Sequence, residues 1–227
     1  MLHEISSRRH EKSYGKKQVL KGLSLYAEPG KCTGIIGANG SGKSTLLRIL
    51  AGVEKADSGR ILIDGEGVKK PSERLSSCVG YIPQESILIP ELTVEDNLKL
   101  WAGFGDYQEN RKILARLCEQ FKLTDFYREK VKNLSGGMNK RVNIVCALIH
   151  QPSILLMDEP SAALDLVFKE ELRECIRDFT KNGGSVLISS HDEGEIAACQ
   201  SLWAIRDGKA AQVNTELPIE KIISDYL

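Results

Sequence analysis

The segment GANGSGKST at residues 37–45 constrains this chain more than any other, because it fits the pattern G-x-x-x-x-G-K-[ST] of a phosphate-binding loop. Glycine has no β-carbon, so the loop's glycines allow the backbone to curl and to point its N–H groups at an anion. Lys43 adds a positive charge for the β- and γ-phosphates, and Ser44 offers a hydroxyl ligand to Mg²⁺. We therefore predict that a nucleoside triphosphate is bound by Gly37, Asn39, Gly40, Ser41, Gly42, Lys43, Ser44 and Thr45.

The flanks of this loop have the periodicity that the motif requires. The apolar run Cys32–Ile36 follows a turn and predicts a strand, and the leucine-rich segment 46–50 predicts a helix that stops at Gly52. Such a helix directs its positive end at the bound anion. The order strand, glycine loop, helix favours a nucleotide site over a chance glycine-rich turn.

A second apolar run, residues 154–157, ends in two acids and predicts a buried strand. Near a phosphate loop, Asp158 can hold Mg²⁺ through water. Glu159 follows directly and can orient or deprotonate an attacking water. A solvated strand end is the alternative, and the phosphate loop upstream argues against it.

The sequence LSGGM at residues 134–138 precedes an amphipathic helix. Ser135 is well placed as the N-cap of this helix, and the two glycines allow the backbone to come close to another group. The apolar face of the helix consists of Met138, Val142, Val145, Cys146 and Ile149, with Asn139, Lys140 and Asn143 elsewhere. Taken alone, the segment is equally consistent with a helix cap and a flexible entry.

These motifs, in this order, resemble those of the ATP-binding domain of ATP-binding cassette (ABC) transporters over nearly the whole chain. Residues 134–138 match the family's signature, usually written LSGGQ, which other phosphate-loop families lack. Tyr14 matches the aromatic residue that stacks on adenine, and Gln84 matches the Q-loop glutamine. Residues 161–165, which end in Asp165, match the D-loop, and His191 matches the H-loop histidine.

The resemblance implies the fold class α/β, with a RecA-like core, an antiparallel β subdomain and an inserted α-helical subdomain. It implies ATP and Mg²⁺ as ligands, with Ser44, Gln84 and Asp158 around the metal. The expected catalytic residues are Glu159, His191 and Lys43, where His191 contacts the γ-phosphate.

Partners follow from the same resemblance. Two ATPase subunits, in a homodimer or heterodimer, pair head to tail around two ATP molecules. Ser135 and Gly137 of one subunit then close over the nucleotide of the other, and Asp165 communicates across the dimer. An integral membrane permease is the further partner, with residues 91–98 as its expected contact surface.

Departures from the family pattern indicate which kind of ABC ATPase to expect. Met138 replaces the signature glutamine, a variant familiar in ATPases of the bacterial ABC-2 exporter group, so we expect export. Ser161 and Ala163 replace the more usual threonine and glycine of the D-loop. The alternative is a soluble ABC ATPase without a transport cycle. A cassette that binds ATP without hydrolysis is disfavoured, since Lys43 and Glu159 are intact.

Composition adds bounds on partners and location. Lys plus Arg and Asp plus Glu are both 31, so the formal charge of zero argues against nucleic acid as the main partner. The apolar run at residues 144–149 is too short to span a bilayer. We therefore expect a cytoplasmic protein that is peripheral on the inner face of the cell membrane through its permease. The six cysteines are expected to be buried thiols, and surface or capping roles are expected for His3, His10 and His150.

The pattern predicts one ABC domain over residues 1–227, with a core at about 1–84 and 151–227 and a helical subdomain at about 85–150. Predicted helices in that subdomain are 94–101, 111–121 and 137–149, and predicted hairpins of the core are 59–65 and 202–211, the latter turning at residues 207–208.

Overall fold

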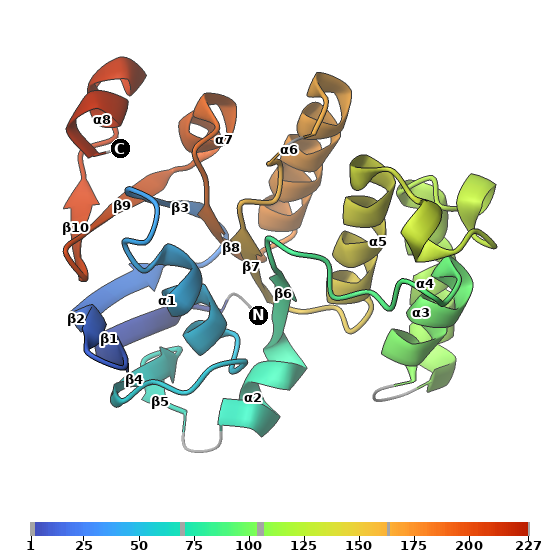
Figure 1. Cartoon of the computed structure of the whole chain (residues 1–227), viewed down its shortest axis with the longest axis horizontal. Coiled ribbons are helices and arrows are strands. Elements are labelled where there is room, and N and C mark those ends of the chain that lie inside the picture. The colour runs from blue at the N-terminus through green and yellow to red at the C-terminus, as the bar shows by residue number, and fades with distance from the viewer. Residues whose placement is uncertain (1–2, 69–70, 104–106, 163, 227) are drawn as a thin grey trace.

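The computed structural model describes residues 3–68, 71–103, 107–162 and 164–226. Its strands form a four-stranded and a six-stranded sheet (Figure 1). The strands are β1 (Ile5–Tyr14), β2 (Lys17–Ala27), β3 (Cys32–Ile36), β4 (Ser58–Ile63), β5 (Glu66–Gly67), β6 (Val79–Ile82), β7 (Ile154–Asp158), β8 (Ser185–Ser189), β9 (Ser201–Arg206) and β10 (Lys209–Val213). The α-helices are α1 (Lys43–Leu50), α2 (Pro71–Cys78), α3 (Val94–Ala102), α4 (Tyr107–Gln120), α5 (Gly136–Leu148), α6 (Leu166–Lys181), α7 (Glu193–Ala198) and α8 (Ile219–Tyr226).

The six-stranded sheet has the order β10-β9-β3-β8-β7-β6 and is parallel except at β10. Every residue of β3, β7 and β8 is buried, because both faces of a parallel sheet are covered. Successive side chains of β7 enter different clusters: Leu156 packs with α1, whereas Leu155 and Met157 pack with α5 and α6. The continuous apolar runs in the sequence therefore correspond to central strands, as predicted.

Helix α1 packs between the two sheets. Leu46, Leu47 and Leu50 share a cluster with Leu20 and Ile63 of the antiparallel sheet β2-β1-β4-β5 and with the central strands of the other sheet. Burying each such side chain contributes roughly 1.5–3 kcal/mol. The phosphate-binding loop, which precedes α1, is thus anchored by the core of both sheets.

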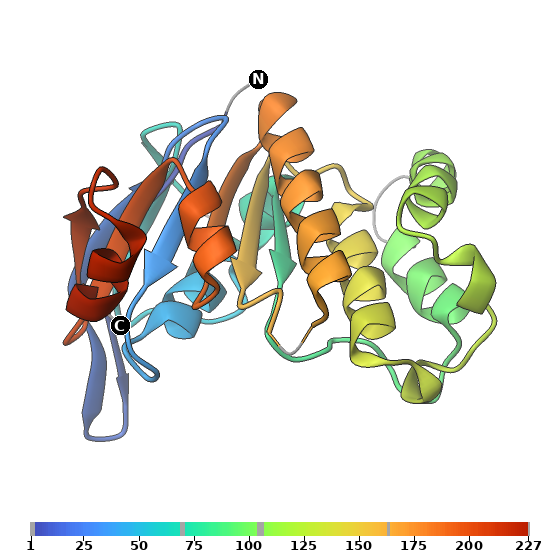
Figure 2. The ribbon, with the colours of Figure 1, turned by 90° about the horizontal axis from the view of Figure 1, so that it is seen from above.

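Helices α3, α4 and α5 form a separate group, on the right in Figure 1 and also apart from α1 in Figure 2. They lie between β6 and β7 in the sequence. The predicted helices of this region are confirmed within a few residues. Helix α3 begins at a capping residue, Thr93, whose hydroxyl accepts a hydrogen bond from the Asp96 N–H at 3.1 Å.

Most other local predictions are also confirmed, including both hairpins of the core, the strand before His191 and, across both subdomains, the six buried cysteine thiols. The prediction for His10 is wrong, because only 2% of the residue is exposed and its Nδ1 lies 2.6 Å from the Ser7 hydroxyl. A register shift between Ser7 and His10, where Arg9 has a positive φ of 52°, changes the face on which His10 lies. Burial also lowers the pKa of His10.

Helices α2, α6, α7 and α8 lie outside the sequence predictions. Helix α2 precedes β6, α6 and α7 flank β8 in the sequence, and α8 follows the last hairpin and buries Ile222 against the core. Within the described ranges, no helix is both long enough and apolar enough to span a bilayer.

Candidate active site

The phosphate-binding loop joins β3 to α1, as its flanks predicted. Gly37 and Gly42 have φ angles of 147° and 112°, which side chains rarely allow. A β-carbon on Gly37 would lie 2.4 Å from the Ile205 carbonyl oxygen, and one on Gly42 would lie 2.7 Å from Leu20 Cδ2. Both glycines are therefore required by the loop's conformation and its tight contact with the core.

Lys43 lies at the centre of a short polar chain. Its ammonium donates hydrogen bonds to the carbonyl oxygens of Gly37 at 2.6 Å and Ala38 at 3.4 Å, and its Nζ lies 3.1 Å from His191 Nε2. Burial lowers the pKa of Lys43, and the carboxylates of Glu159 and Asp158 oppose that shift. The ammonium is therefore held inside the loop, where a phosphate group needs positive charge.

The two acids and the histidine come from neighbouring parallel strands, β7 and β8. The Ser189 hydroxyl donates to Asp158 Oδ1 at 2.6 Å, and the Glu159 N–H donates to the Ser189 carbonyl oxygen at 3.0 Å. Glu159 has a positive φ of 45°, a conformation that is uncommon outside glycine. Its Oε1 lies 3.3 Å from His191 Nε2. The structure thus joins Glu159, His191 and Lys43, the predicted catalytic residues, in one cluster.

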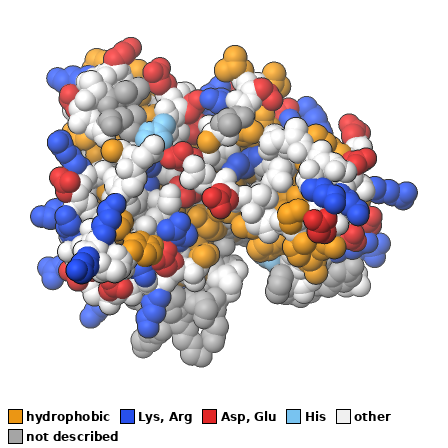
Figure 3. Space-filling model, viewed as in Figure 1, with side chains coloured by type: hydrophobic (Ala, Val, Ile, Leu, Met, Phe, Trp, Pro, Cys, Tyr) orange, Lys and Arg blue, Asp and Glu red, His pale blue; other side chains and the backbone are white. Residues whose placement is uncertain are grey.

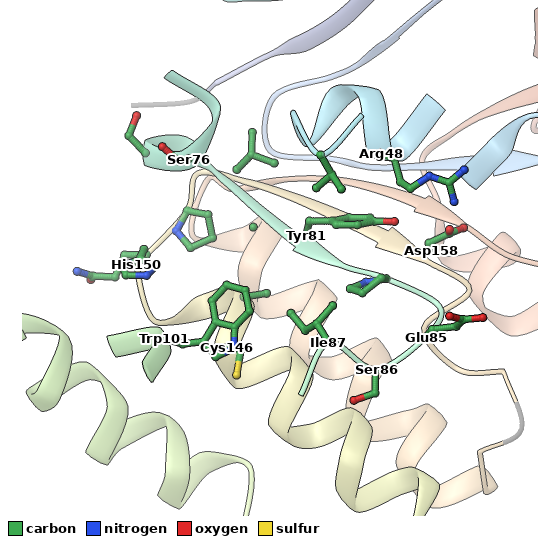
Figure 4. A pocket seen from close by; sticks show the side chains of 18 of the residues that line it. Arg48, Ser76, Tyr81, Glu85, Ser86, Ile87, Trp101, Cys146, His150 and Asp158 are labelled. Carbon is green, nitrogen blue, oxygen red and sulfur yellow. The ribbon is translucent and has the colours of Figure 1, made fainter. Parts of the chain in front are cut away.

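Ser44, Gln84 and Asp158 line one cavity of about 1080 Å³. It extends from α1 to the junction with α3–α5, and Figure 4 shows Asp158 at one side of it and Trp101 and His150 at the other. A hydroxyl, an amide and a carboxylate are hard oxygen donors of the kind that Mg²⁺ prefers, with phosphate oxygens and water completing its shell. The donor set that lines this cavity therefore fits the predicted metal.

Asn39, Gly40 and Ser41 face a different cavity, of about 630 Å³, which Lys17 and Tyr226 also line. The phosphate loop thus separates two hollows of the molecule.

Tyr14 lies at the end of β1 with 45% of its surface exposed. Its hydroxyl donates to the Glu54 carboxylate, and Lys12 Nζ lies 5.3 Å from the centre of its ring. Arg48 of α1 pairs with the same Glu54 at 2.9 Å. The ring is therefore tied to α1 at its hydroxyl end and keeps exposed surface.

Ser135 caps α5, as predicted, and its hydroxyl accepts a hydrogen bond from the Met138 N–H at 3.3 Å. Ser135 is exposed, and a β-carbon on Gly137 would meet no atom within 4 Å. Neither residue lines the two cavities at the phosphate loop. The structure therefore does not bring the signature to the loop of its own chain.

In the D-loop, Asp165 caps α6 by accepting a hydrogen bond from the Phe168 N–H at 2.9 Å. Ser161 is buried, and Ala163 lies outside the described residues. Sequence reasoning missed Ser189, whose hydroxyl donates to Asp158, and two buried polar residues, Lys140 and Asn143, which bond to the loop that carries Gln84. Ser189 could have been found from its hydroxyl at the end of a predicted strand. Lys140 and Asn143 could have been found from the row of polar residues along one predicted helix.

Comparison with known proteins agrees with this arrangement. The ABC transporter family model matches residues 20–162. The linearmycin resistance ATP-binding protein LnrL of Bacillus subtilis is 34% identical over 209 residues, which cover 91% of this chain and 67% of that protein. The Nod factor export ATP-binding protein I of Burkholderia orbicola is 37% identical over 209 residues, covering 90% of this chain and 68% of the relative. The chain thus spans about two thirds of the length of these relatives.

A solved structure gives the same result for the fold. The dimeric ATP-binding cassette MJ0796, in a post-hydrolysis state with ADP and phosphate, superposes with a TM-score of 0.82 at 27% identity. The match covers 92% of this chain and 99% of that one. The predicted fold class is confirmed, and the chain belongs to the ABC transporter family of ATP-binding proteins.

Proposed function

We propose that this chain is the ATP-hydrolysing subunit of an exporter that works on a separate membrane permease. The cluster of Lys43, His191 and Glu159 beside the phosphate loop carries the hydrolytic part. The export direction is supported by Met138 in the signature and by the name of a relative that exports Nod factors.

In the proposed mechanism, the loop's N–H groups and Lys43 hold the phosphates and neutralise their charge. Glu159 orients the attacking water and accepts its proton, and His191 contacts the γ-phosphate. Ser44, Gln84 and Asp158 would hold Mg²⁺, which would supply further neutralisation of the phosphate charge. Tyr14 stacks on adenine. Phosphoryl transfer asks for little covalent chemistry, so positioning does most of the work.

The proposed active unit is a dimer of two cassettes, identical or not, arranged head to tail. Ser135 and Gly137 of one subunit cover the nucleotide on the other, and Asp165 links the two sites. Two observations support this: the exposed, open signature at the start of α5, and the dimeric state of the similar cassette MJ0796. We also propose the domain limits of about 1–84 and 151–227 for the core and 85–150 for the helical subdomain.

We propose that the permease docks at the junction between core and helical subdomain. Within the predicted contact surface, residues 91–98, Glu91 and Asp96 are exposed, whereas the apolar Val94 and Leu98 are fully buried. The cavity at the junction is lined by exposed apolar residues instead, Val53 at 66% and Ile87 at 40% exposure. Figure 3 shows hydrophobic side chains along the hollow between the two parts. Docking there would make the chain a cytoplasmic protein held at the inner face of the membrane.

The test is isolation of the tagged chain from its own cells in mild detergent. We expect an integral membrane protein to accompany it. Val53→Glu should reduce the recovered permease roughly tenfold or more, because an unpaired charge would be desolvated at the contact. Ala211→Glu is the matched control, since Ala211 is exposed on β10 and does not line the cavity. A chain that hydrolyses ATP with no membrane protein attached would instead favour the soluble ABC ATPase.

Nucleotide binding and chemistry should separate in two further variants. Lys43→Ala should weaken binding of a non-hydrolysable ATP analogue about 10- to 100-fold, because a hydrogen bond to a charged group contributes roughly 1.5–3 kcal/mol. His191→Ala should leave affinity within about threefold of wild type and slow turnover, since its contact matters most in the transition state. Isothermal titration measures both affinities. Equal losses of affinity would contradict the separate roles.

A further inference from the structure

The polar side of helix α5 does not face solvent. Lys140 and Asn143 lie on it one turn apart, and only 9% and 2% of these residues are exposed. Charged and amide side chains are seldom buried without partners. Their partners therefore indicate what this side of the helix is for.

Both side chains contact the backbone of one loop, residues 83–87, which leaves β6 and carries Gln84. The Lys140 ammonium donates to the carbonyl oxygens of Pro83 at 3.0 Å and Gln84 at 3.4 Å. Asn143 Oδ1 accepts from the Ile87 N–H at 3.2 Å, and its Nδ2 donates to the Ser86 hydroxyl at 3.2 Å. Two residues of α5 thus hold both ends of the loop.

The position of the Lys140 charge also bears on its role. Burial lowers the pKa of Lys140, and the carboxylates of Asp158 and Glu195 oppose that shift. Through its bond to Pro83, Lys140 extends from the helical subdomain to the carboxyl end of β6, which pairs with the end of β7 where Asp158 lies. A buried cation needs such compensation to remain charged. Filling space would have required only an apolar side chain.

Helix α5 is continuous from Gly136 to Leu148, so the capping residue Ser135 and the two loop contacts belong to one rigid element. A displacement of α5 would carry the loop with it, because the loop's backbone groups are bonded to the helix. The signature and Gln84 are far apart in the sequence, yet this helix connects them physically.

We propose that Lys140 and Asn143 are positioning residues that fasten the Gln84 loop to α5, so that Gln84 and the signature take up their working positions together. This inference rests on the proposed role of Gln84 in the nucleotide site. It adds that Gln84 is correctly placed only while the loop is held by these two side chains.

Lys140→Met keeps the length of the side chain and removes its donors. We expect kcat for ATP hydrolysis to fall roughly 10- to 100-fold, because a displacement of about 1 Å in a working group can cost that much. The KM for ATP should stay within about threefold, since the phosphate loop is untouched. Lys132→Met is the control: Lys132 is exposed in the same subdomain and pairs with Glu91 at the surface, at 3.0 Å.

Asn143→Leu removes the other loop contacts without changing charge near Asp158. The same fall in kcat in both variants would therefore identify positioning rather than charge as the cause. Asn143→Leu also tests the positioning role if Lys140→Met does not fold, and circular dichroism would detect such a loss of folding.

A double-mutant cycle with Gln84→Ala distinguishes a positioning role from general loss of structure. If Lys140 acts through Gln84, Lys140→Met should have no further effect in the Gln84→Ala background. Fully additive losses, or wild-type kcat in both Lys140→Met and Asn143→Leu, would overturn the inference. Wild-type kcat in Gln84→Ala alone would instead overturn the proposed role of Gln84.

Discussion

Glu159→Gln should reduce kcat for ATP hydrolysis by about 10²–10⁴-fold while ATP still binds. The amide has the size of the carboxylate but cannot accept the proton of the attacking water. The backbone around residue 159 should be unchanged, because its N–H bonds to Ser189 do not involve the side chain. The substitution removes the carboxylate charge beside His191, whose Nε2 lies 3.3 Å from Oε1. A defect in chemistry alone is therefore expected.

The variant should also accumulate as an ATP-bound dimer, which size-exclusion chromatography with and without ATP would detect. Glu174→Gln is a matched control on α6, where Glu174 is exposed and pairs only loosely with Arg177 at 3.8 Å. The control should hydrolyse ATP at the wild-type rate and form no trapped dimer. Turnover by Glu159→Gln near the wild-type rate would remove Glu159 from the role of general base.

The sequence was sufficient to predict those parts of the fold and the site that depend on neighbouring residues alone. The phosphate loop needs glycine at positions where φ is positive, and β7 needs an unbroken apolar run because both its faces are covered. Such requirements are met by neighbouring residues. The loop, the strand that ends at Asp158 and the cap at Ser135 were therefore predictable before any fold was known.

The contact of Lys43 with His191 was not predictable from local pattern, since 148 positions separate the two residues. It depends on strand order: β8 lies between β3 and β7, so the ends of all three strands meet. The roles of Lys43 and His191 at one site were predicted from the resemblance to ABC cassettes, because hydrophobic periodicity carries no information about such distant contacts.

Burial of polar residues was the main failure of pattern reading. His10 turned inward because of a register shift, and a bulge is not visible in the alternation of side chains. The sequence placed Lys140 and Asn143 away from the apolar face of their helix, yet both side chains bond to backbone groups of a distant loop. Every residue type carries much the same backbone donors and acceptors, so the sequence alone could not identify these backbone partners.

Ser135→Arg should abolish ATP hydrolysis and leave ATP binding by the isolated chain nearly normal. Ser135 is exposed at the start of α5, whereas the phosphate loop lies at the start of α1, apart from it in both ribbon views (Figures 1 and 2). A bulky cation at this position would block the close approach of a second subunit to its nucleotide. Loss of the cap costs only about 1 kcal/mol, too little to unfold the helix.

Ser135→Thr is the control for this variant, because threonine keeps the capping hydroxyl and little bulk is added. It should retain both binding and hydrolysis. Isothermal titration with a non-hydrolysable analogue measures binding by the monomer, and phosphate release measures turnover. If the site is shared between chains, Ser135→Arg should lose ATP hydrolysis and retain ATP binding.

Mixing Ser135→Arg with excess Lys43→Ala extends the test to the dimer. In the mixed dimer, one site combines the intact phosphate loop of the first variant with the intact signature of the second, so some hydrolysis should return. A partner carrying both substitutions offers no intact signature and should give no rescue. Rescue also requires that one competent site can turn over alone, so the binding result is decisive. If Ser135→Arg destroys ATP binding by the isolated monomer, Ser135 serves the nucleotide of its own chain and the proposed head-to-tail arrangement is wrong.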